Sequence, residues 1–79
     1  MIKINTKTEF IQFVEDLKQS FLNEPEKWEN KNLDDFLEAL ARYAEDIQGY
    51  YDNSEQQINA DEASWKVFAD LLKGASMYE

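Results

Sequence analysis

Cysteine and histidine are both absent from this 79-residue chain, which also has only two glycines and one proline. Without cysteine there is no disulfide framework, Cys-ligated zinc site or thiol nucleophile, and the chain is compatible with a reducing compartment. Without histidine, the commonest general base and metal ligand is missing. The scarcity of glycine and proline leaves little turn chemistry for β-hairpins, which favours an all-α fold.

Long hydrophobic runs are also absent. No segment approaches the ~20 apolar residues that a membrane-spanning helix requires, and the N-terminus lacks the apolar core of a signal peptide. The sequence therefore predicts a soluble, cytoplasmic protein without membrane contact. A chain of 79 residues has room for one domain, 1–79, with a modest core.

Apolar residues recur with helical spacing in three segments. They predict a small three-helix bundle with helices over about residues 7–22, 33–51 and 62–77, and a further single helical turn over 25–28 stays open. The third segment is apolar over more than half of its helical wheel, so we expect it to be the most buried helix. The predicted core consists of Phe10, Phe13, Val14, Leu17, Phe21, Leu33, Phe36, Leu37, Leu40, Ala44, Ile47, Phe68, Leu71, Leu72 and Ala75.

Signals for the ends of these helices are uneven. Thr6 and Glu9 have the spacing of a capping box, Pro25 breaks the first pattern, and Asn32 precedes the second. Gly49 is compatible with a helix interior but could also end the second helix in a left-handed cap. Three residues could cap the third helix: Asn59, Asp61 and Ser64.

The net charge of −9 argues against direct nucleic-acid binding, which requires basic residues to neutralise phosphates. The charge is concentrated in the middle of the chain: −8 over residues 32–62, against −1 over 1–31 and 0 over 63–79. On a helical wheel, four acids of the second helix fall within about 40° of one another. We name these residues the acidic column: Asp34, Glu38, Glu45 and Asp52.

Two tyrosines follow Gly49 at the end of this helix. If the helix continues, Tyr51 falls in the apolar sector and Tyr50 at its border with solvent. Exposed tyrosines are frequent at binding hot spots, and a face of one charge sign speeds association with an oppositely charged partner. We therefore expect a docking site for a basic protein partner, made of Asp34, Glu38, Glu45, Asp46, Tyr50 and Asp52.

Other interpretations stay open. The acids could serve only to solvate the chain. The wide apolar face of the third helix could make the chain a structural unit that forms a homodimer if other helices do not cover that face. Asp34 and Glu38, four residues apart, could share a divalent cation, but no EF-hand pattern is present. The chain could also bind a small ligand.

Enzymatic activity is not expected. The serines have no histidine to activate them, and no glycine-rich phosphate loop occurs. We accordingly predict no catalytic residues, no metal ligands and no cofactor.

The second half of the chain carries a set of short motifs. A Trp-Glu-Asn box spans residues 28–30, a Phe-Leu-Glu-Ala segment spans 36–39, and the last helix contains Trp65 before a terminal Tyr78-Glu79. Over residues 28–79 this arrangement resembles a family of small acidic bacterial proteins known only as a domain of unknown function. The resemblance implies the fold but no activity.

A second likeness concerns surface chemistry alone. The excess of acid with Asp46, Tyr50 and Tyr51 is similar to the small acidic immunity proteins that neutralise colicin nucleases. In those proteins, acids and a tyrosine pair dock onto a basic toxin. This chain departs from their pattern because a glycine precedes the tyrosines and no proline follows them. The likeness is an analogy that implies an immunity-like partner.

Overall fold

A computed structural model describes residues 4–78 of the chain. In chain order its elements are α1 (Lys7–Asn23), the 3-10 turn η1 (Pro25–Lys27), α2 (Leu33–Asn53) and α3 (Trp65–Met77). The described residues contain no strand, which confirms the predicted all-α, three-helix class. None of these helices has the length and apolar character needed to cross a membrane.

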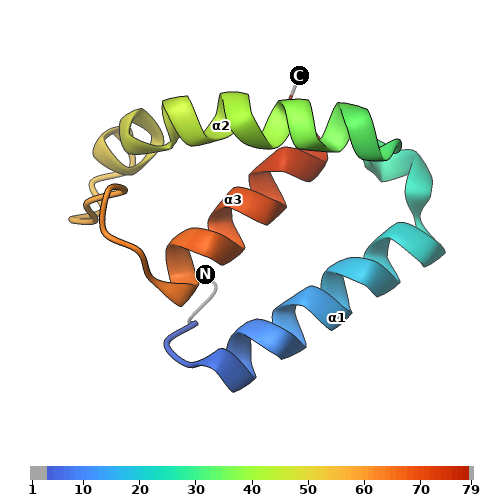
Figure 1. Cartoon of the computed structure of the whole chain (residues 1–79), viewed down its shortest axis with the longest axis horizontal. Coiled ribbons are helices and arrows are strands. Elements are labelled where there is room, and N and C mark those ends of the chain that lie inside the picture. The colour runs from blue at the N-terminus through green and yellow to red at the C-terminus, as the bar shows by residue number, and fades with distance from the viewer. Residues whose placement is uncertain (1–3, 79) are drawn as a thin grey trace.

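The helix α3 is the central element. In Figure 1, α1 and α2 diverge from the connection that contains η1, and α3 lies between them. It packs against both helices, most extensively against α2. It also has the most buried residues of the three helices, as expected, whereas α1 has none.

Local signals explain where the helices begin. The capping box of α1 is present: the Glu9 amide donates to the Thr6 hydroxyl (3.2 Å), and the Thr6 amide donates to the Glu9 carboxylate (3.1 Å). The helix α3 begins at Trp65, three residues later than predicted, because Ser64 is the residue that caps it by accepting from the Val67 amide (3.1 Å).

The second helix continues through Gly49 to Asn53, so this glycine does not end it. A Cβ at Gly49 would meet no atom within 4 Å, and the position is an ordinary exposed helical site. Asn32 occupies the N-cap position, but its side chain makes no capping hydrogen bond. Asn32 therefore occupies the predicted N-cap position, but the predicted capping hydrogen bond is absent.

The core lies between α2 and α3, around Ile47, Tyr51 and Val67. It is smaller than predicted, because α1 and α2 each pack mainly against α3 and not against one another. The apolar stripes of all three helices are wider than the faces that this arrangement covers. Five predicted core residues are consequently exposed: Val14, Leu33, Leu37, Ala44 and Phe68.

The prediction also missed several buried residues. They are mostly small side chains of α2 and α3, with one residue that precedes α1. The buried residues absent from the predicted core list are Ile4, Ala39, Tyr51, Val67, Ala69 and Ser76.

The Trp-Glu-Asn segment links the connection between α1 and α2 to the C-terminal end of α3. The backbone amides of Glu29 and Asn30 donate to the Ser76 carbonyl (2.9 and 3.3 Å). The side-chain amide of Asn30 donates to the carbonyls of Ala75 (2.9 Å) and Tyr78 (2.6 Å). These bonds satisfy carbonyls at the C-terminus of α3 that have no partner within the helix. Asn30 therefore caps α3, a helix 35 residues further along the chain.

Candidate docking face on helix α2

The acidic column lies on the outer side of α2. Asp34, Glu38, Glu45 and Asp52 are all exposed, whereas Ile47, on roughly the opposite side of the helical wheel, is buried against α3. The structure therefore leaves all four carboxylates accessible along one ridge.

One cation offsets this ridge. The Arg42 guanidinium pairs with the Glu38 carboxylate at 2.6 Å, and both side chains are more than half exposed. Exposed pairs of this kind contribute about 0–1 kcal/mol to stability, so this pair stabilises the fold only slightly. Among the described residues, Asp34, Glu45 and Asp52 form no ion pair. The ridge therefore keeps a strong negative charge.

The C-terminal end of the column is fixed to the loop that follows α2. The Gln48 side chain donates to Asp52 (3.0 Å) and to the Ile58 carbonyl (2.9 Å). Its own carbonyl accepts from the Ala60 amide (2.7 Å). These hydrogen bonds, which were not predicted from the sequence, fix the position of the Asp52 carboxylate in the column.

Asp46 and Tyr50 do not join the column. The Asp46 carboxylate accepts a hydrogen bond from the Tyr78 hydroxyl, and this bond raises the pKa of Tyr78. Tyr50 is 51% exposed, but it lines a hollow together with Lys66 and Lys73 of α3. The predicted six-residue site thus divides into a four-residue column and two residues at its margin toward α3.

Tyr51 is fully buried, as its place in the apolar sector predicted. Its hydroxyl donates to the Asp70 carboxylate (2.7 Å), which also pairs with Lys66 (2.6 Å). Burial, followed by the Asp70 hydrogen bond, raises the pKa of Tyr51. A buried tyrosine cannot contact a partner, so the likeness to the tyrosine pair of immunity proteins extends at most to Tyr50.

Asp70, a partly buried acid of α3 beside this tyrosine, was not identified from the sequence. Two signals pointed to it. Lys66 lies four residues before it, which is the spacing of a helical ion pair. A tyrosine in an apolar sector also needs a hydrogen-bond partner for its hydroxyl.

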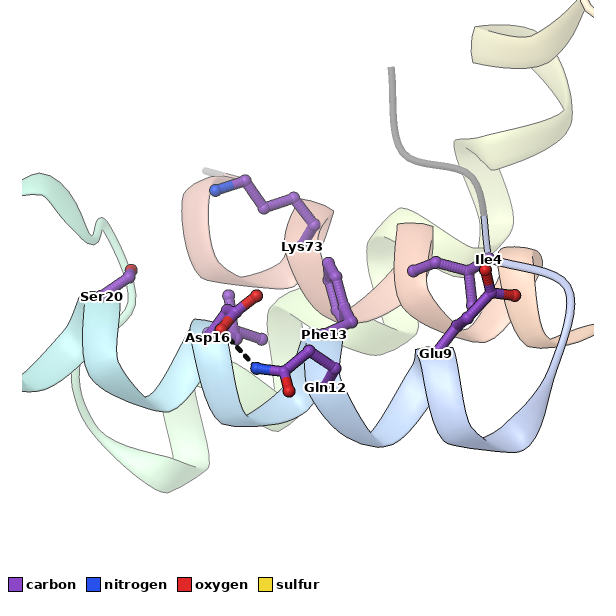
Figure 2. A pocket seen from close by; sticks show the side chains of 8 residues that line it. Ile4, Glu9, Gln12, Phe13, Asp16, Ser20 and Lys73 are labelled. Atoms are coloured by element: carbon purple, nitrogen blue, oxygen red, sulfur yellow. Dashed lines mark hydrogen bonds between the residues drawn. The ribbon is translucent and has the colours of Figure 1, made fainter.

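A hollow of about 440 Å³ lies along α1 and is bordered by Lys73 of α3 (Figure 2). It is the place where the small-ligand interpretation would apply. Its carboxylates are already engaged, because Glu9 belongs to the capping box and Asp16 accepts from Gln12 (2.9 Å). Lys73 extends above Phe13 at its edge. Within residues 4–78, no three acids are grouped so that they could hold a metal ion.

Comparison with known proteins identifies the family but no activity. Residues 6–79 match a family of unknown function, DUF7660. No curated protein and no solved structure shows a significant match. The family match begins at Thr6 and so includes α1, whereas the resemblance seen in the sequence covered residues 28–79. With nearly its whole length matched, the chain belongs to the DUF7660 family of unknown function.

Proposed function

We propose that this chain is a non-catalytic module that binds a basic protein through the acidic column. The observation that supports the proposal is the exposure of four carboxylates on the side of α2 away from α3, with Arg42 as the one basic residue of the helix. A face of one sign steers an oppositely charged protein toward it and raises the association rate.

The column has the dimensions of a protein contact. Asp34 and Asp52 are 18 residues apart in one helix, so the column extends for about 27 Å. Carboxylates spread along a ridge in water cannot provide the paired acid and base of a cleft, whose pKa values must differ. The same spread suits a partner with several separated lysines or arginines.

Tyr50 extends this face toward α3. Its ring lies 5.9 Å from that of Tyr51, and the buried neighbour limits its freedom. A half-exposed tyrosine held in this way offers contact area at a small entropic cost. Together with Asp46, it would form the margin of the interface. A basic nuclease neutralised in an immunity-like manner is one partner of the proposed kind.

Cross-linking in the native host tests the proposal. The tagged chain should capture a basic protein that is lost when Asp34, Glu38 and Glu45 are all changed to lysine. Circular dichroism must show that this variant stays helical, which is expected because all three side chains are exposed. Equal capture by the folded variant and the wild type would contradict the proposal.

A further inference from the structure

A second surface lies where α1 ends and α2 begins, next to the N-terminal end of the acidic column. Trp28 forms its floor, with the ring centroid of Phe21 at 5.0 Å and that of Phe36 at 6.0 Å. The groove has a volume of about 340 Å³ and is flanked by Leu22 and Leu33. We name it the Trp28 groove.

The leucines around this groove are unusually exposed. Leu22 is 62% exposed, Leu33 is 73% exposed, and Leu37, one helical turn after Leu33, is 52% exposed. Scattered exposed leucines need no explanation, but apolar side chains gathered around an aromatic groove are typical of an interaction surface. The neighbouring helices leave these three leucine side chains uncovered.

The total surface area indicates how much is left uncovered. The chain exposes 5718 Å², whereas a compact monomer of its mass should expose about 5000 Å². The excess of roughly 700 Å² is close to the ~800 Å² that each partner buries in a standard interface. The exposed leucines of the Trp28 groove contribute to this excess.

The charges around the groove indicate which partner would cover it. Lys31 lines it and Asp34 directly follows Leu33, and among the described residues neither of these two charges forms an ion pair. A face with both signs can match opposite charges with a copy of itself around a two-fold axis. We propose that the Trp28 groove is a self-association surface on which a second copy of this chain docks. This differs from the α3 dimer considered from the sequence, because the groove is lined by α1, α2 and the connection between them.

Sedimentation velocity from micromolar to roughly 1 mM protein tests this proposal, since the upper limit corresponds to an association free energy of only about 4 kcal/mol. The wild type should convert from monomer to dimer within this range. The variant with Leu22→Gln and Leu33→Gln, the two leucines that line the groove, keeps the net charge and should dissociate at least tenfold more readily, because each leucine is lost from both copies. Met77→Gln, at a similarly exposed leucine-sized side chain on α3 (58%), should dimerise as the wild type does.

A chain that remains monomeric at every concentration overturns the proposal, as does equal weakening by Met77→Gln. Fluorescence gives an independent result in the Trp65→Phe background, where Trp28 is the remaining tryptophan. Quenching by acrylamide should then decrease as the dimer forms, and unchanged quenching in a dimer would place the interface elsewhere. Because all these measurements use the purified chain alone, their failure leaves the basic-partner proposal untouched.

Discussion

Tyr51 donates a 2.7 Å hydrogen bond to Asp70, and this part-buried bond joins α2 to α3. Replacing Tyr51 by phenylalanine should lower the free energy of unfolding at pH 7 by about 1–3 kcal/mol, because a bond to a charged acceptor is lost. Urea unfolding measures this loss. An unchanged midpoint would show that the bond adds nothing to stability.

Tyr51 should also make the stability of the fold depend on pH in the alkaline range. The pKa of Tyr51 is raised above its ordinary value of 10.0, so the folded chain keeps a proton that the unfolded chain loses. The contribution of this raised pKa to the free energy of unfolding is fully present below about pH 10. It decreases above that pH by up to about 1.4 kcal/mol per pH unit. Between pH 10 and 11, Tyr51→Phe should therefore lose stability less steeply than the wild type. Parallel slopes would contradict the assignment.

The two glycines should respond in opposite directions to alanine. A Cβ at Gly74 would lie 2.2 Å from the Tyr43 ring, so Gly74→Ala must displace that ring and should cost about 1–3 kcal/mol. Gly49 has open space in the middle of α2, and Gly49→Ala should stabilise the fold by about 0.5–1 kcal/mol. Thermal unfolding of both variants checks the pair. Equal shifts would exclude the close packing of Tyr43 on Gly74.

Asn30 caps α3 and Asn32 does not, so the same substitution at the two positions tests this cap. Asn30→Asp replaces the donor that serves two carbonyls with an acceptor, and it should cost about 1–3 kcal/mol. Asn32→Asp makes the same chemical change where no capping bond exists, and the N-terminus of α2 favours a negative charge. It should be neutral or slightly stabilising. Similar losses in the two variants would rule out the distant cap.

Glu55 has a left-handed backbone, with φ of 58°. This conformation costs a residue with a Cβ about 1–2 kcal/mol and costs glycine little. Glu55→Gly should raise the melting temperature, while Gln57→Gly in the same loop should lower it. A decrease in both variants would contradict the strain assigned to Glu55.

The sequence predicted the helices better than it predicted their packing. Periodicity and caps depend on residues close in the chain, so the three helices and the Thr6 cap were accessible. Which part of an apolar stripe is covered depends on the direction of the neighbouring helix. Leu33 and Leu37 lie in the stripe of α2 but outside its contact with α3. No local pattern distinguishes them from Ile47.

The candidate site shows the same division. The helical wheel correctly placed the four acids of the column on one exposed ridge. It could not show that Asp46 is bound to Tyr78, because the two residues are 32 positions apart. The role of Asn30 at the end of α3 was hidden for the same reason. Bonds between distant segments become visible only once the fold is known.

In the proposed function, the position of the acids along α2 binds the partner, beyond the effect of their total charge. The most direct measurement compares two folded variants with the captured basic protein, by calorimetry. One changes Asp34, Glu38 and Glu45 to lysine. The other changes Glu15, Glu26 and Glu62, which are exposed acids outside the column. Three such reversals add six charges in each case and move the net charge from −9 to −3.

The two variants are also matched in their ion pairs, since Glu38 pairs with Arg42 and Glu15 pairs with Lys18. The account predicts that the column variant loses at least 100-fold in affinity, which is about 2.7 kcal/mol. The control should lose much less, because exposed charges beyond a Debye length of about 10 Å are largely screened. Equal losses in the two variants would contradict the account and reduce the acidic column to a solvated face.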